Sequence, residues 1–225
     1  MLGQNWNDGG GAMPARGGER PSFRDILNPL TGLTAAQAKA LPPDERFAGM
    51  RAVTVDGKRW TYNLTSALVA DGDRLVMVPD VAGAGGRFLA DPGQIVDLSL
   101  PIGFATADAA VLYTMPVGSA LLVRRGYWGV TADFTGGASS AIGLSSGQSP
   151  HNVKGDLHGG AGGDLAATLV AAGGLFIEGI VGTDVAAGIL LKGGATILFD
   201  RIVSVFAAGA GFGHVVGELI ANPGA

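Results

Sequence analysis

The sequence predicts an all-β protein: an antiparallel β-sandwich or jelly-roll-like C-terminal domain, preceded by a small β-meander module, one short helix and an extended N-terminal arm. Three observations predict this class. First, 39 glycines and 11 prolines among 225 residues interrupt short apolar runs along the whole chain. Second, many of these runs alternate apolar and polar side chains, as strands do. Third, roughly eight to ten runs follow one another at the short spacing typical of a sandwich.

Residues 1–42 are expected to form the extended arm. Glycine and polar residues dominate its first part, which cannot bury enough apolar surface to offset the entropy of ordering it. Trp6 and Phe23 are the aromatic residues of this part. We expect them to anchor the arm on a partner, because buried aromatic side chains carry much of the energy of interfaces.

The arm ends in a short helix, predicted at residues 34–41. Thr34 and Gln37 have the spacing of a capping box, in which each side chain bonds the backbone of the other residue. Pro42 and Pro43 end the helix, because proline cannot donate a backbone hydrogen bond.

Residues 43–92 predict the small meander module. Two strands with alternating side chains flank Asp56-Gly57, a pair that favours a hairpin turn. Asp71, Gly72 and Asp73 predict a second turn. The strands are expected at residues 50–55, 58–63, 75–79 and 87–89. A sheet of this size needs support from a neighbouring domain or subunit.

Residues 93–225 predict the sandwich domain. Some of its runs, such as 186–191, are apolar on both faces, which suits strands buried within a sandwich or at a subunit interface. The strands are expected at residues 94–100, 110–114, 119–123, 127–134, 140–144, 166–170, 175–181, 186–191, 195–206 and 213–220.

The chain carries few charges. Charged residues make up 15% of the sequence, and the formal net charge is −4. A weakly charged surface predicts a subunit that copies of itself or other proteins cover, and we expect a homo-oligomer, with a trimer favoured. The alternative is a β protein that is simply rich in small residues. Basic residues are scattered, so no nucleic acid is expected as a partner, and the apolar stretch at 104–123 is too interrupted to predict a membrane helix.

The pair Arg124-Arg125 precedes Tyr127 and Trp128, which leaves two interpretations open. Two cations beside two aromatic rings could stack on nucleic-acid bases. The same residues also suit the end of a strand with aromatic packing. The second interpretation is favoured, because no wider basic surface surrounds the cluster.

Sequence motifs for catalysis or for binding a metal or phosphate are weak. His151, Asp156, His158 and Asp164 share a glycine-rich loop, but their spacing matches no zinc pattern. Residues 159–164 match one copy of a calcium-binding repeat that works only in stacks. No nucleophile elbow or phosphate-binding loop is present. The sequence therefore predicts no enzyme, no cofactor and no metal.

Several segments together resemble a known family. They are residues 43–50, 53–57, 60–63, 70–72, 76–79 and 85–88, followed by 127–137, 154–157 and 199–202. The first six resemble a short β module of tailed-bacteriophage fibre, spike and head proteins: a strand with an aromatic residue, an Ala-Asp-Gly turn, a strand ending in proline, and a glycine-rich stretch into Gly-Arg-aromatic. Phe88 stands where tryptophan is commoner. The later segments are similar to phage virion structural proteins.

The resemblance implies a structural protein of the virion, made in the cytoplasm of the bacterial host. Its first implication is a capsid decoration (cement) protein that binds the major capsid protein and stabilises the head shell. The alternative is a head, neck or tail fibre or spike subunit with a carbohydrate-binding β-sandwich. The residues expected to contact partners are Trp6, Phe23, Trp60, Tyr62, Tyr127 and Trp128. The last four could also form an aromatic platform for a sugar.

Overall fold

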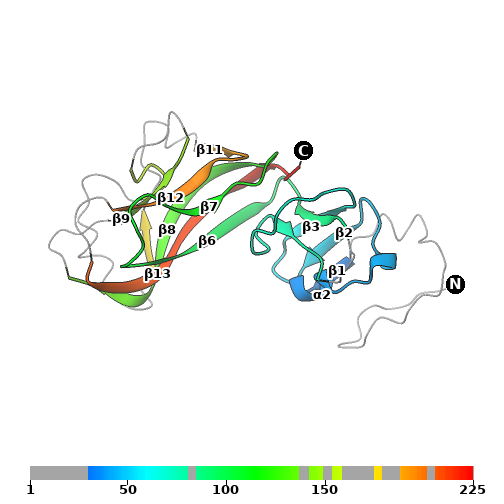
Figure 1. The fold of residues 1–225 in the computed structure, drawn as a ribbon, viewed down its shortest axis with the longest axis horizontal. Coiled ribbons are helices and arrows are strands. Elements are labelled where there is room, and N and C mark those ends of the chain that lie inside the picture. Colours follow the sequence, from blue (N-terminus) through cyan, green and yellow to red (C-terminus); the bar gives the residue numbers. More distant parts are fainter. Residues whose placement is uncertain are drawn as a thin grey trace.

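A computed structural model describes residues 30–80, 85–136, 142–148, 154–158, 175–178, 188–201 and 206–224. Two lobes lie side by side along the long axis: a small module formed by the first strands, and a larger β-sandwich (Figure 1). The last strand ends at the waist between them. No helix among the described residues is long and apolar enough to span a membrane.

The small module is a five-stranded mixed sheet with the order β1-β2-β3-β5-β4. The first pair is parallel and the other pairs are antiparallel. Its elements are β1 (Leu30–Leu33), α2 (Ala35–Lys39), the 3-10 helix η1 (Pro43–Glu45), β2 (Arg51–Thr54), β3 (Arg59–Asn63), β4 (Val76–Met77) and β5 (Arg87–Ala90).

The small module begins earlier than its predicted boundary at residue 43. Leu30–Leu33 pairs with β2, so this part of the predicted arm is a strand of the sheet. Four residues that include a glycine are too few to show the apolar–polar alternation of a strand, so the sequence did not predict this strand. The capping box of α2 is present: the Gln37 N–H donates to Thr34 Oγ1 at 3.2 Å, and the Thr34 N–H donates to Gln37 Oε1 at 2.8 Å. The helix ends at Lys39, before the predicted residue 41.

The predicted hairpin between β2 and β3 is present. Gly57 has a φ of +82°, a conformation that glycine adopts without steric cost. Its N–H donates to the Thr54 carbonyl at 2.8 Å and closes the turn. Trp60, which follows on β3, donates its indole N–H to Thr54 Oγ1 at 3.2 Å. The turn thus sets the register that directs Trp60 into the core.

The larger lobe confirms the predicted sandwich. One antiparallel sheet has the order β10-β8-β13-β6, with β11 also paired to β8, and the second has the order β7-β12-β9. The strands are β6 (Ile95–Gly103), β7 (Ala110–Thr114), β8 (Ala120–Thr135), β9 (Ile142–Ser146), β10 (Leu175–Glu178), β11 (Ile189–Lys192), β12 (Thr196–Arg201) and β13 (Ala208–Ala221). The strand predicted at 166–170 lies outside the described residues.

Strand β8 corrects one prediction. The runs at 119–123 and 127–134 form one strand of 16 residues, where two were expected. The register along β13 shifts between Val216, opposite Arg125, and Gly217, opposite Val123. An extra residue therefore bulges out at Arg124, and both arginines are exposed. The two charges that resembled a strand end mark a bulge within a continuous strand.

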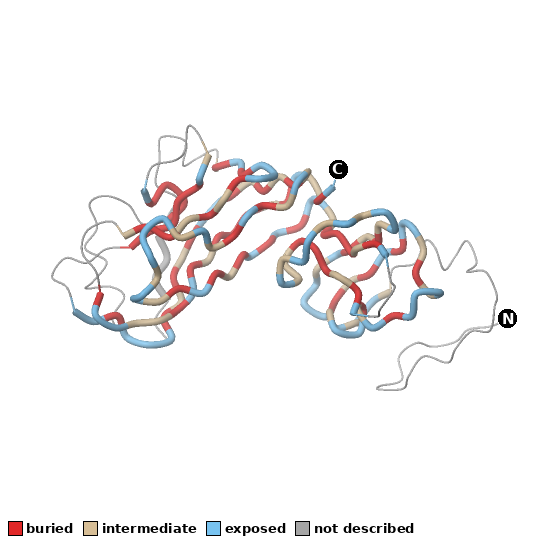
Figure 2. Tube along the Cα trace, viewed as in Figure 1, coloured by how far each residue is buried: buried red, intermediate tan, exposed pale blue. Residues whose placement is uncertain are grey.

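The sandwich core is packed around Trp128, which is 1% exposed. A Cβ atom on Gly213 of β13 would lie 2.8 Å from Trp128 Cζ3 and 2.9 Å from Leu144 Cδ1. Only a residue without a side chain leaves room for the indole at this position. Buried and exposed stretches alternate along the sandwich strands, as expected for sheets with one face on the core (Figure 2).

The Asp71 turn joins the small module to the sandwich. The Asp71 carboxylate accepts hydrogen bonds from the backbone N–H groups of Arg74, Leu75 and Val76, at 3.0, 2.8 and 2.9 Å. It also accepts a hydrogen bond of 2.6 Å from the hydroxyl of Tyr113, which lies on β7 of the sandwich. One side chain therefore shapes the turn and contacts the neighbouring lobe.

Arg74 adds a second link across the same junction. Its guanidinium lies 5.5 Å from the centre of the Tyr113 ring and donates to the Ser99 carbonyl at 3.0 Å. Ser99 belongs to β6, an edge strand of its sheet, and a covered edge is protected from pairing with other chains. Burial and the charge of Asp71 raise the pKa of Tyr113 far above its usual range, so its hydroxyl remains a donor.

Candidate interaction surface

The β10-β8-β13-β6 sheet has one face directed away from the sandwich core, here called the outer face. Alternation along β6 places Ile95 and Pro101 on this side, and Ile95 is 67% exposed. Phe212 and Ile220 of β13 are 38% and 48% exposed. The residues of the outer face are Ile95, Asp97, Ser99 and Pro101 of β6, Phe212, His214, Val216, Glu218 and Ile220 of β13, and Leu122, Arg125 and Tyr127 of β8.

A polar cluster lies at the centre of the outer face. Tyr127 and His214 are opposite one another on β8 and β13, and their rings stack with centroids 4.2 Å apart and planes 6° apart. The Tyr127 hydroxyl donates to Asp97 Oδ2 at 2.6 Å, and His214 Nδ1 lies 3.0 Å from Asp97 Oδ1. The Phe212 ring lies 6.4 Å from the imidazole. Because Asp97 belongs to β6, the cluster connects three strands and fixes its own geometry.

The cluster predicts an alkaline transition. Burial and the hydrogen bond to Asp97 raise the pKa of Tyr127 from 10.0 to about 12. The folded protein thus holds the phenol proton more tightly than the unfolded chain does. The corresponding stability is complete below pH 10 and is lost as the pH rises through about 12. Ultraviolet difference absorbance should show a tyrosine step near pH 12 that Tyr127→Phe removes. A Tyr127 step near pH 10 would contradict the bond to Asp97.

Three of the residues predicted to contact partners lie in the core instead. Trp60, Tyr62 and Trp128 are 1%, 2% and 1% exposed. Trp60 and Tyr62 lie in the small module, and the Tyr62 hydroxyl donates to the Gly85 carbonyl. The interpretation of these rings as a surface platform is therefore corrected to a packing role. They fall on the inward positions of their strands, which alternation alone could not separate from the outward positions.

The remaining predicted contacts are Trp6, Phe23 and Tyr127. Trp6 and Phe23 lie outside the described residues, and Tyr127 lies on the outer face. Tyr127 and its neighbour Trp128 are on opposite sides of β8, so they cannot stack together on one ligand. Asp97 and His214 were not among the residues predicted to contact partners. The alternation around both residues was visible, but the pairing of β6 with β13 was not.

The histidine-containing loop has a packing role where it is described. Asp156 accepts hydrogen bonds from the N–H and the hydroxyl of Ser146, at 2.6 and 2.7 Å. His158 is fully buried, its ring lies 5.0 Å from that of Trp128, and its backbone bridges to Leu144 of β9. Both residues thus hold the loop against the second sheet.

Within the described ranges, no three side chains of histidine, cysteine, aspartate or glutamate come together as metal ligands would. His151 and residues 159–164 lie outside those ranges. The loop therefore offers no assembled metal centre in the part of the chain that is described.

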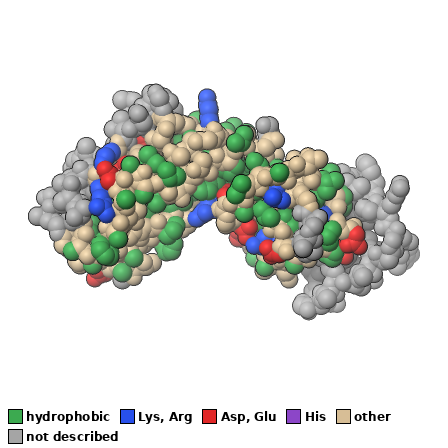
Figure 3. All heavy atoms as spheres, viewed as in Figure 1, with side chains coloured by type: hydrophobic (Ala, Val, Ile, Leu, Met, Phe, Trp, Pro, Cys, Tyr) green, Lys and Arg blue, Asp and Glu red, His purple; other side chains and the backbone are tan. Residues whose placement is uncertain are grey.

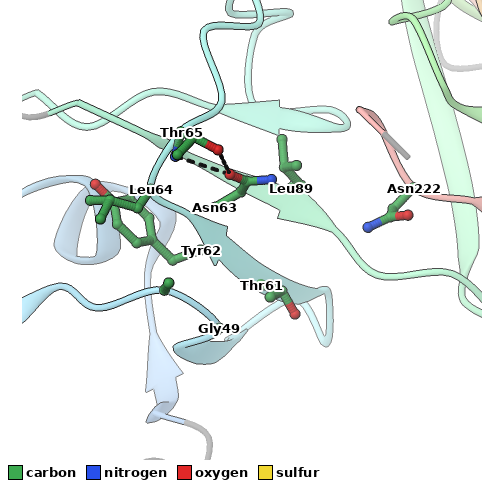
Figure 4. A pocket seen from close by; sticks show the side chains of 9 residues that line it. Gly49, Thr61, Tyr62, Asn63, Leu64, Thr65, Leu89 and Asn222 are labelled. Carbon is green, nitrogen blue, oxygen red and sulfur yellow. Dashed lines mark hydrogen bonds between the residues drawn. The ribbon is translucent and has the colours of Figure 1, made fainter.

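A shallow groove of about 370 Å³ lies on the small module, beside the end of the sandwich (Figure 4). Thr61, Asn63 and Leu89 line it from the sheet, and Asn222 lines it from the segment after β13. Asn63 Oδ1 accepts from the N–H and hydroxyl of Thr65, both at 3.1 Å. Both lobes thus contribute to this groove.

A second hollow of about 370 Å³ adjoins the groove and shares Thr61 and Asn222 with it. Arg51, Arg59 and Asp91 are among the residues that line it. The Thr61 hydroxyl donates to Asp91 Oδ1 at 2.6 Å. The combined surface is open, and both donors and acceptors lie among the residues that line it.

Charged side chains gather at the far end of the sandwich and around the small module (Figure 3). Between these places, apolar and uncharged atoms dominate the visible surface. This distribution leaves wide areas of the sandwich with little electrostatic barrier to protein contact.

Comparison with known proteins found no matching family model, no matching curated protein and no matching solved structure.

Proposed function

We propose that the protein is a non-enzymatic structural component of a tailed-phage particle, acting as a decoration protein that binds the major capsid protein and stabilises the head shell. The observation that carries the proposal is the outer face, where Ile95, Phe212 and Ile220 remain exposed around an ordered polar cluster. Exposed apolar side chains grouped on one face, within a weakly charged chain, support a role in protein contact. The phage-like segments of residues 43–88 support the class of particle.

The two-lobed shape suits a protein that spreads its contacts over a lattice. Each lobe presents a different surface, and residues 1–29 precede β1 in the sequence. Many weak contacts made by one molecule add through effective concentration, so a modest surface can hold firmly to an ordered shell. In this role the protein is made in the bacterial cytoplasm and resides in the virion.

The proposal predicts that particles lacking this protein are less stable. Phage made without it should release DNA at a lower temperature, and at a lower concentration of chelator, because contacts across the shell are missing. Particle melting followed by a DNA-binding dye measures this, and purified protein added back to the depleted particles serves as the control. Unchanged melting of particles shown to lack the protein would refute the cement role.

A second candidate is a fibre or spike subunit that binds carbohydrate. The groove and the hollow beside it favour this candidate, because Thr61, Asn63, Asp91 and Asn222 offer the hydroxyl, amide and carboxylate groups that bind sugar hydroxyls. A glycan array separates the two proposals. Binding that Asn222→Ala abolishes would favour the fibre or spike, whereas no binding by folded protein would leave the decoration role alone.

A further inference from the structure

We propose that the hollow beside the groove binds an acidic sugar, that is, a sugar unit that carries one carboxylate next to free hydroxyl groups. The inference names the ligand of the carbohydrate-binding candidate described above, on which it rests. The hollow is lined by the small module and by Asn222, and it shares no residue with the outer face. The two surfaces can therefore be tested separately.

Two arginine side chains line the hollow from the solvent side of the small sheet. Burial alternates along β2 and β3, so Ala52 and Trp60 point into the core. Arg51 and Arg59 each precede one of these residues and lie on the opposite side, where both are exposed. Arg51 is opposite Thr61, which is two residues along β3 from Arg59. Such diagonal neighbours lie about 7–8 Å apart, within reach of long side chains, so both guanidinium groups can bind one anion.

Most hydrogen-bond donors of these two arginines remain available. The Arg51 side chain makes no hydrogen bond or ion pair with any residue that the structure describes. The Arg59 side chain donates one bond to this part of the chain, from Nη2 to the Pro92 carbonyl at 3.3 Å. Each guanidinium has five N–H donors in a planar fork that matches a carboxylate. Because the chain as a whole has a net charge of −4, this pair of cations marks a local preference for an anionic group.

Asp91 restricts which anion fits. Its carboxylate lines the same hollow, and its Oδ1 accepts a hydrogen bond of 2.6 Å from the Thr61 hydroxyl. Within the described ranges it forms no ion pair with Arg51 or Arg59, so the three charged side chains remain open to a ligand. An ionised carboxylate only accepts hydrogen bonds, and it repels a second negative group. The ligand must therefore offer one anionic group to the arginines and hydroxyl donors to Asp91, as an acidic sugar does.

The neighbouring groove extends the site with uncharged groups. Thr61 and Asn222 line both the hollow and the groove, and Asn63 lines the groove (Figure 4). An amide offers donors and an acceptor, as sugar hydroxyls require. None of the described residues that line the groove is charged, so we expect the carboxylate at the Arg51 end and neutral hydroxyls at the Asn63 end. A run of acidic residues in a peptide would instead set further carboxylates against Asp91.

Titration of the isotope-labelled full chain with sodium glucuronate and with sodium galacturonate, followed by nuclear magnetic resonance, tests the inference. At least one of these acidic sugars should cause saturable shifts of the Asn222 side-chain amide signals and of the Nε–H signals of Arg51 and Arg59. Glucose and galactose lack the carboxylate, and acetate lacks the hydroxyls. Each of these three should bind about tenfold more weakly or less, because one set of hydrogen bonds is missing.

Variants of the lining residues assign the binding to this hollow. Arg51→Gln and Arg59→Gln should each weaken binding of the acidic sugar about tenfold, because a charged hydrogen-bond donor is lost. Arg124→Gln, which changes an exposed arginine of the sandwich, is the matched control and should bind like the unmodified chain. Asp91→Asn should lower the preference for the acidic sugar over acetate, because the repulsion of a second negative group is removed.

Circular dichroism reports whether each variant folds, and the exposed Arg51→Gln carries the test if Arg59→Gln does not fold. Three results would overturn the inference: no binding of either acidic sugar, equal binding of acetate, or binding that Arg51→Gln leaves unchanged. Neutral glycans bound on the array without binding of acidic sugars would refute this ligand and leave the carbohydrate-binding candidate in place. No binding of any glycan would remove both. Neither result bears on attachment of the protein to the head shell, which is measured on particles.

Discussion

Replacing Trp128 by alanine is expected to lower the free energy of unfolding by about 3–5 kcal/mol. The indole is 1% exposed and fills the space above Gly213, where a Cβ atom would lie 2.8 Å from the ring. Its removal leaves a large cavity between the two sheets, because Leu144 and the buried His158 on the other side are held by their own backbone pairing. Urea denaturation followed by circular dichroism measures the change.

The neighbouring residue provides the matched control for this substitution. Tyr127→Phe removes one hydrogen bond on the opposite side of the same strand and should cost only about 1 kcal/mol. Equal effects of the two substitutions would contradict the assignment of Trp128 to the core and Tyr127 to the outer face. Loss of ligand binding in Trp128→Ala would reflect damage to the fold rather than removal of a contact residue.

Replacing Asp71 by alanine is expected to cost about 2–4 kcal/mol and to weaken the coupling between the two lobes. Three backbone N–H groups and the Tyr113 hydroxyl donate to this carboxylate, at 2.6 to 3.0 Å. Without it, these donors remain in a largely buried junction without an acceptor. Scanning calorimetry should show one cooperative transition in the unmodified protein and two separated transitions in the variant.

Two further variants separate the roles of this turn. Tyr113→Phe removes only the bond between the lobes, so it should split the transitions with a smaller total loss of stability. Asp73→Asn lies in the same turn and removes only a partly exposed ion pair with Lys39, at 3.0 Å, which should cost less than about 1 kcal/mol. A loss in Asp73→Asn as large as in Asp71→Ala would contradict the central place of Asp71.

Much of the fold follows from local sequence signals. Alternation and turn residues located most strands of both lobes, and the capping box at Thr34 located the helix. These signals act over a few residues, and the structure satisfies them with local hydrogen bonds, as at Gly57. Where a signal was weaker than the tertiary packing, prediction failed: β1 is too short to show a period, and the bulge at Arg124 divided β8 into two apparent strands.

The candidate surface was harder to predict, because it depends on which strands pair. Asp97 and His214 are 117 positions apart and meet only because β6 lies beside β13. Asp71 was correctly expected in a turn, but its bond to Tyr113 also depends on the contact between lobes. The sequence shows where the aromatic residues are, but it does not show which face of the sheet each side chain occupies. Trp60, Tyr62 and Trp128 were therefore predicted at a surface, whereas the structure places them in the core.

The most direct test of the proposed function is to image purified particles of the phage that encodes this chain, with the protein labelled by an antibody or a fused tag. The proposal predicts label in regular, multiple copies over the head shell. Label confined to the neck, the tail or its fibres would favour the fibre or spike alternative over a decoration protein. Particles that carry no label, while the protein is abundant in the infected cell, would contradict a structural role in the virion altogether.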